Sequence, residues 1–209
     1  MNLRRAVRSL ALTAALTLLA VSVLAQRAAA LAPGETAPQA EVALKNVDGR
    51  DVTIASAQGP KGTLVLFTCN HCPWVKAWEE RISRLGNQAR KRGIGVIAIN
   101  SNDPVAYPED SFENMQKRAK QRGFAFPYAV DATSDVARAF GATHTPEAFL
   151  FDAAGKLVYH GTIDDNARAP KQVKSRYLQD AVDAVLAGKP VPLAETKSLG
   201  CSIKFRGEK

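Results

Sequence analysis

The sequence predicts an α/β domain in which helices flank a central mixed β-sheet. Two apolar runs, Leu64–Phe67 and Gly95–Asn100, carry no polar face, as expected of strands buried on both sides. Between them, apolar residues recur every three or four positions from Trp74 to Ala89, which predicts an amphipathic helix. A strand, a helix and a second strand in this order favour a right-handed parallel unit.

An added hairpin is predicted before the first buried strand. Glu41–Lys45 and Asp51–Ile54 flank Asp48-Gly49, a strong signal for a tight turn between two antiparallel strands. Ser56–Lys61 is then a polar loop that leads into the central strand.

The second half of the sheet is predicted to combine one more parallel strand with a terminal hairpin. Asp110 and Glu113 form a capping-box pattern for a helix that ends at Arg122. Thr133 is expected to cap a short helix through Phe140. The remaining predicted elements are the strand Phe126–Val130, the strands Glu147–Phe151 and Lys156–His160 around the turn Asp152–Gly155, and the helix Ser175–Ala187.

The N-terminal segment has the pattern of a secretory signal peptide. Arg4, Arg5 and Arg8 precede an apolar run without acidic residues, and Val23-Leu24-Ala25 fits a cleavage site. Cleavage after Ala30 fits equally well. We therefore predict a signal peptide over 1–25, or as far as 30, a domain over 31–188 and a tail over 189–209. A periplasmic or secreted protein is expected, without membrane integration after cleavage.

The charge of the chain argues against a nucleic-acid partner. The sequence holds 28 Lys and Arg against 20 Asp and Glu, a net charge of +8. Four of the arginines lie in the leader, so the mature domain is close to +4. No basic block of the kind that binds nucleic acid remains.

The residues that carry chemistry are Cys69 and Cys72, separated by two residues between the buried strand and the helix. Unpaired N–H groups and the positive end of a helix dipole stabilise a thiolate at this position. In such Cys-x-x-Cys motifs the thiol pKa falls from about 8.5 to about 3.5–7.5. A redox-active dithiol is the first hypothesis.

Together with Thr145-Pro146 before the terminal hairpin and the order of the elements, Phe67–Pro73 resembles the thioredoxin superfamily. The N-terminal hairpin and the insertion between Ser101 and Pro127 resemble its redoxin branch, the relatives of alkyl hydroperoxide reductase. The resemblance implies a thioredoxin-like fold over roughly Leu31 to Gly188 and thiol–disulfide exchange with protein substrates and a redox partner protein. It implies no cofactor besides the Cys69–Cys72 disulfide, and no metal.

The resemblance also implies roles for individual residues. Cys69 is expected to be nearer solvent and to attack as the thiolate, and Cys72 to resolve the mixed disulfide. An imidazolium at His71 would stabilise the Cys69 thiolate. Thr145-Pro146 matches a cis-proline loop that offers backbone groups to an extended substrate. Glu147 is either a proton acceptor near the sulfurs or a solvated carboxylate at the strand end.

Two alternatives come from departures and partial matches. Cys69, His71, Cys72 and His144 could converge on copper, as in metallochaperones of the Sco type, although the cysteine spacing is one residue shorter here. A thiol peroxidase of the peroxiredoxin type requires Pro-x-x-x-Thr-x-x-Cys, and counting back from Cys72 places Cys69 at the threonine position.

Cys201 is a third cysteine, in a tail long enough to fold back over the domain. Three interpretations stay open: a buried inert thiol, an additional redox thiol that exchanges with Cys69 or Cys72, and an intermolecular bridge.

Overall fold

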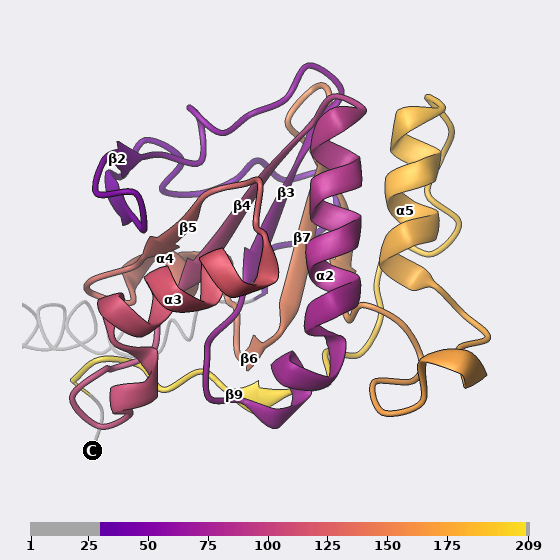
Figure 1. Cartoon of the computed structure of the whole chain (residues 1–209). Coiled ribbons are helices and arrows are strands. Elements are labelled where there is room, and N and C mark those ends of the chain that lie inside the picture. The colour runs from indigo at the N-terminus through magenta and orange to yellow at the C-terminus, as the bar shows by residue number, and fades with distance from the viewer. Residues whose placement is uncertain (1–29, 208–209) are drawn as a thin grey trace, which may run out of the picture.

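The computed structural model of the chain describes residues 30–207 (Figure 1). The predicted signal peptide lies outside the described residues, apart from the last position of its longer version. Within residues 30–207, no helix is both long and apolar enough to span a membrane.

The sheet consists of two hydrogen-bonded groups of strands, and the last strand of the first group lies beside the first strand of the second group. The first group has the order β2 (Asp51–Val52), β1 (Leu44–Asn46), β5 (Tyr128–Val130) and β4 (Ile94–Asn100). The second group has the order β3 (Gly62–Phe67), β7 (Glu147–Asp152) and β8 (Leu157–Gly161). β4 pairs in parallel with β5, whereas the pairs β1–β2, β1–β5, β3–β7 and β7–β8 are antiparallel. The sheet is mixed, as predicted, and β1–β2 is the added hairpin.

Helices cover both faces of this sheet (Figure 1). On one face, Trp78 of α2 (Pro73–Lys91), Met115 of α3 (Phe112–Arg122) and Leu178 of α5 (Tyr177–Leu186) share a core cluster with the even positions of β3. On the other face, Phe140 of α4 (Asp135–Phe140) packs with the odd positions of β3. The alternation of β3 between two cores explains why its sequence is apolar on both sides. The predicted thioredoxin-like α/β fold is confirmed.

Two local predictions about helix starts are corrected. The N-cap of α3 is Ser111, whose side chain accepts a hydrogen bond from the Asn114 N–H, rather than Asp110. Asp110 ends a short 3-10 helix, η1 (Pro108–Asp110), and its carboxylate points elsewhere. α4 has Ser134 at its N-cap position, and Thr133 contributes only a long hydrogen bond, from the Asp135 N–H to its hydroxyl (3.3 Å).

The tail forms a strand that the sequence analysis did not predict. A short 3-10 helix, η2 (Pro170–Gln172), precedes α5. After α5 the chain returns across the ends of the sheet strands, where β9 (Cys201–Ser202) pairs antiparallel with β6 (His144–Thr145). Figure 1 shows β9 and β6 at the same end of the molecule as the start of α2. The tail therefore lies at the end of the sheet that carries the two cysteines.

Candidate active site

Cys69 and Cys72 lie where β3 passes into α2. Thr68 still belongs to the sheet, since its N–H donates to the Ile99 carbonyl (2.9 Å). Cys72 is the N-cap residue of α2, and Pro73 occupies the first helical position, where no N–H is required. Both cysteines are free thiols. Cys69 is 2% exposed and Cys72 is 0% exposed, so both thiols are buried and the expected greater exposure of Cys69 amounts to a small difference.

Thr145 contacts both sulfurs. The Cys69 Sγ and the Thr145 Oγ1 are 3.2 Å apart, and the Cys72 thiol donates to the Thr145 carbonyl oxygen at 3.2 Å. The peptide bond between Thr145 and Pro146 is cis, as predicted. Thr145-Pro146 therefore packs directly against the dithiol.

The two thiols shift one another's pKa through a hydrogen bond between them. Hydrogen bonding with Cys72 raises the pKa of Cys69, and burial and the Asp110 carboxylate act in the same direction. Hydrogen bonding with Cys69 lowers the pKa of Cys72 against the opposing effect of burial, and Cys201 and the Val75 N–H assist. The interaction between the two thiols therefore favours ionisation of Cys72 over ionisation of Cys69.

His71 faces an acidic partner that the sequence analysis assigned to another role. Its Nδ1 lies 2.6 Å from the Asp110 Oδ2, and its ring stacks on Tyr107 with 4.8 Å between centroids. The Asp110 side chain is fully buried and also accepts hydrogen bonds from the Asn70 N–H (2.6 Å) and the Asn102 Nδ2 (2.8 Å). Asp110 thus fixes the backbone between the two cysteines and orients His71.

The segment between the cysteines is held by further polar contacts. The Asn70 side chain donates to the Glu109 carbonyl (2.9 Å) and accepts from the Tyr128 hydroxyl (3.0 Å). The Asn70 carbonyl accepts from Arg118 at 2.7 Å. Asp110, Tyr128 and Arg118 were not among the predicted site residues. The one sequence signal was the acidic pair Glu109-Asp110 after a Pro-rich loop, and it fits a helix start equally well.

Glu147 is neither solvated nor engaged with the sulfurs. The side chain is 1% exposed; its Oε2 accepts from the N–H groups of Thr143 and His144 (both 2.8 Å), and its Oε1 contacts His160 Nε2 (2.7 Å) and the Ser198 hydroxyl (2.9 Å). Burial by itself raises the pKa of Glu147, but these hydrogen bonds outweigh it and the pKa lies below its ordinary value. Glu147 therefore supports the loop before Pro146.

Cys201 lies beside the dithiol. It faces Thr145 across the β6–β9 pair and packs, with Trp74, against the cluster of Cys69, Cys72 and Val75. Unlike the other two cysteines it is partly exposed, so a buried inert thiol does not describe it. Burial and interaction with Cys72 raise the pKa of Cys201 to about 11.

The ligand set that the copper alternative requires is only partly brought together. Ligand atoms of Cys69, His71 and Asp110 lie within 4.8 Å of one another. His144 does not belong to this group; its Nδ1 is 2.8 Å from the Thr143 hydroxyl. The Asp110 carboxylate is the hydrogen-bond partner of His71 within this group.

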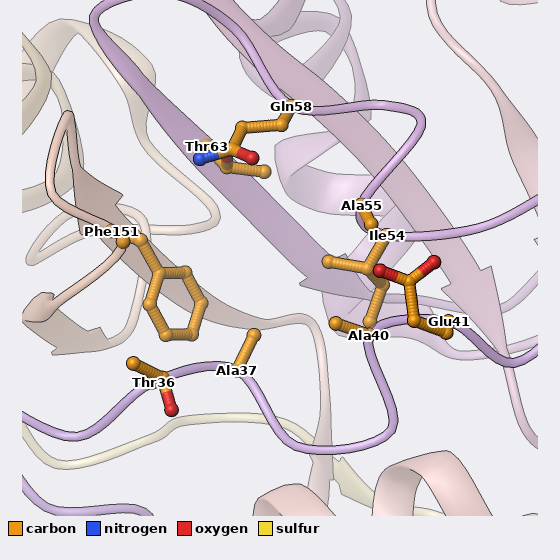
Figure 2. A pocket seen from close by; sticks show the side chains of 10 residues that line it. Thr36, Ala37, Ala40, Glu41, Ile54, Ala55, Gln58, Thr63 and Phe151 are labelled. Carbon is orange, nitrogen blue, oxygen red and sulfur yellow. The ribbon is translucent and has the colours of Figure 1, made fainter.

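A pocket elsewhere on the molecule does not serve the dithiol. Figure 2 shows it between residues 36–41, β3 and β7. The volume of this pocket is about 220 Å³. None of the cysteines contributes to its lining, which consists of Thr36, Ala37, Ala40, Glu41, Ile54, Ala55, Gln58, Thr63, Phe151 and Gly155. The thiols therefore lie at the sheet end, away from this pocket.

The chain is similar to thiol–disulfide oxidoreductases and to solved structures of uncharacterised proteins. It is 28% identical to the thiol-disulfide oxidoreductase ResA of Geobacillus thermodenitrificans over 128 residues, 61% of this chain and 68% of that protein. An uncharacterised conserved protein from Geobacillus kaustophilus is 41% identical, with a TM-score of 0.78, over 85% of this chain and 94% of that one. A hypothetical protein from Sinorhizobium meliloti is 37% identical, with a TM-score of 0.79, over 86% and 98%.

The family match and the oxidoreductase relatives agree on the class of activity. Residues 33–160 match the model of the AhpC/TSA family. Further relatives named thiol-disulfide oxidoreductase ResA are 22–25% identical over 55–61% of this chain. These matches identify an oxidoreductase and support thiol–disulfide oxidoreduction. The chain therefore belongs to the AhpC/TSA family, in the redoxin branch of the thioredoxin superfamily.

Proposed function

We propose that this protein exchanges disulfides with exported protein substrates through the Cys69/Cys72 dithiol. The observation that carries the proposal is the convergence of both sulfurs on Thr145, next to the cis bond to Pro146, at the N-terminus of α2. Helix N–H groups stabilise a thiolate there, and two thiols that are hydrogen-bonded to one another interconvert with a disulfide without large movement. No organic cofactor is required.

In the reducing direction, a proton passes from Cys69 to Cys72 and Cys69 attacks a substrate disulfide as the thiolate. The substrate S–S bond breaks, one substrate thiol leaves, and Cys69 forms a mixed disulfide. Cys72 then attacks the Cys69 sulfur, which releases the second substrate thiol and leaves the Cys69–Cys72 disulfide. The oxidising direction is the reverse of these steps, and a redox partner protein restores the starting state.

The residues around the dithiol support these steps because they hold the sulfurs and the neighbouring backbone in place. Thr145 and Pro146 form the platform beside the sulfurs, and Glu147 holds the two N–H groups that precede this platform. His71 and Asp110 hold the loop between the cysteines, and both side chains lie beside Cys69.

The proposed location is the periplasm or the outside of the cell. The leader over residues 1–25, or as far as 30, supports export, and an oxidising compartment is where protein disulfides persist.

Single-cysteine variants test the mechanism. Cys69→Ser should abolish insulin disulfide reduction, whereas Cys72→Ser should accumulate a mixed disulfide that mass spectrometry detects on Cys69. Wild-type protein with alkylated thiols, and circular dichroism of each variant, control for background rate and for folding. Full activity in a folded Cys69→Ser variant would contradict the proposal. Stoichiometric copper on the reduced protein, or rapid consumption of hydrogen peroxide, would favour one of the alternatives.

The direction of exchange follows from the reduction potential of the Cys69–Cys72 pair. A value near about −120 mV would identify an oxidant of the DsbA kind, and a value near about −270 mV a reductant of the thioredoxin kind. Equilibration with glutathione buffers, followed by alkylation, measures it.

A further inference from the structure

The C-terminal tail reaches the dithiol as a paired strand. In the β6–β9 pair, Cys201 lies opposite Thr145, the residue that contacts the sulfurs of Cys69 and Cys72. The approach requires a glycine: a Cβ on Gly200 would lie 2.3 Å from the Thr145 carbonyl oxygen. Backbone pairing thus places the third thiol directly beside the other two.

The tail is fixed on both sides of Cys201. Upstream, the Thr196 N–H donates to the His160 carbonyl (3.0 Å). Downstream, the Ile203 N–H donates to the Thr143 carbonyl (2.9 Å), and the Ile203 side chain is 5% exposed within the core. The position of Cys201 is therefore determined by the fold rather than by a chance contact of a loose end.

The three sulfurs form a series from the surface inwards. Cys201 is partly exposed, whereas Cys69 and Cys72 are 2% and 0% exposed. The Cys201 thiol interacts with the Cys72 sulfur, which in turn interacts with Cys69. Cys201 is therefore the thiol of the three that is most accessible from solvent.

We propose that Cys201 is a third redox residue, which passes the disulfide between the buried Cys69–Cys72 pair and an external protein dithiol. The inference rests on the proposed function and extends it to a residue outside the region matched by the family model, residues 33–160.

The exchange balances without a further oxidant. The Cys201 thiolate attacks the Cys72 sulfur of the Cys69–Cys72 disulfide; the Cys72–Cys201 bond forms, and Cys69 leaves as a thiolate that takes up the proton lost by Cys201. One thiol of the external protein dithiol then attacks the Cys201 sulfur, which forms a mixed disulfide between the partner and Cys201 and releases Cys72. The second thiol of the partner attacks this mixed disulfide and releases Cys201. The partner leaves oxidised, and all three cysteines are reduced.

The first test removes one member of the series. Cys69→Ser leaves Cys72 and Cys201, which should form an intramolecular disulfide when the protein is treated with oxidised dithiothreitol. Peptide mapping without reduction identifies the cross-linked pair. Free thiols at both positions in a variant with a native circular dichroism spectrum would overturn the proposal.

The second test separates strand pairing from mere proximity. Gly200→Ala in the Cys69→Ser background keeps both thiols but forces the tail away from the Thr145 backbone. We expect this double variant to lose the Cys72–Cys201 cross-link. An undiminished yield of that cross-link would show that the β6–β9 pair does not bring the thiols together.

The third test measures the flow of electrons. Cys201→Ser should slow reduction of the Cys69–Cys72 disulfide by a thioredoxin-type protein dithiol by about tenfold, because the attacked sulfur is then buried. Ser202→Ala is the matched control, since the Ser202 residue is exposed on the same strand and its hydroxyl accepts a hydrogen bond from the exposed Lys204 side chain. An unchanged rate in Cys201→Ser, with wild-type exchange intact, would overturn this inference alone. Absence of exchange in the wild type would instead contradict the proposed function.

Discussion

At the scale of single residues, Glu147 combines a buried negative charge with a purely structural position. Four groups donate to or contact its carboxylate, and two of them are backbone N–H groups of the segment before Thr145. Charge-assisted hydrogen bonds of this kind are stronger than neutral ones, and removal of the charge leaves buried donors without an equal partner.

Glu147→Gln should therefore lower the free energy of unfolding at pH 7 by about 1–3 kcal/mol. The folded-state pKa of Glu147 lies below the unfolded value near 4.5, so its contribution is fully present above that value and is lost as the pH falls through the folded pKa. Urea denaturation of wild type and variant from pH 7 to pH 3 measures the difference. A gap that widened on acidification would contradict this assignment.

The residue types with a strong local signature were predictable, and those defined by tertiary contacts were not. Cys69, Cys72 and Pro146 stand in recognisable motifs, and the structure brings them together. Asp110 was taken for a helix cap because Asp before Glu113 fits a capping box locally. Its actual partners, Asn70 and His71, are about 40 residues away in sequence, where periodicity and spacing carry no information.

At the scale of elements, the start of α3 divides two tasks between adjacent residues. Ser111 caps the helix, with its side chain accepting from the Asn114 N–H at 3.4 Å. Asp110 turns toward the cysteine loop, where its negative charge raises the pKa of Cys69. Substitutions at the two positions should therefore affect different properties of the protein.

Ser111→Ala should lower the free energy of unfolding by about 0.5–1 kcal/mol and leave thiol reactivity unchanged. The expected loss lies at the low end of the range for N-caps because the hydrogen bond is long.

Asp110→Asn should move the pH profile of iodoacetamide alkylation at Cys69 to lower pH, because the carboxylate that raises the pKa of Cys69 is gone. Alkylated peptides are quantified by mass spectrometry. Asp131→Asn, at a buried aspartate that bonds Ser101 and Ala137, is the control. These assignments would be contradicted if Ser111→Ala moved the alkylation profile of Cys69 and Asp110→Asn left it unchanged.

The regular elements were predicted more completely than the irregular ones. The central strands and α2 have long, uniform patterns, so β3, β4 and α2 appear nearly where expected. β6 and β9 have two residues each, and their pairing joins positions far apart in sequence. Strands this short have no periodicity to detect, and tertiary packing alone determines them.

At the scale of the whole molecule, the tail completes the domain on one side. Residues 189–209 were predicted as a tail long enough to fold back over the domain, and Ile203 of this tail belongs to the core cluster that contains Phe140 and Phe149. The same segment covers the end of the sheet where the cysteines lie (Figure 1). We therefore predict that local opening of the tail controls access of a substrate to Cys69.

Ile203→Ala should shift this equilibrium toward the open form. Truncation of a buried Ile costs about 2–5 kcal/mol in well-packed cores, and here the loss falls on the contacts that hold the tail. We expect Cys69 to be alkylated faster at constant pH, as followed by peptide mass spectrometry. Leu199→Ala is the matched control because Leu199, in the same tail, is 36% exposed and is therefore less buried than Ile203. If Ile203→Ala lowered the melting temperature but left the alkylation rate of Cys69 unchanged, the tail would not be the barrier that separates the dithiol from its substrates.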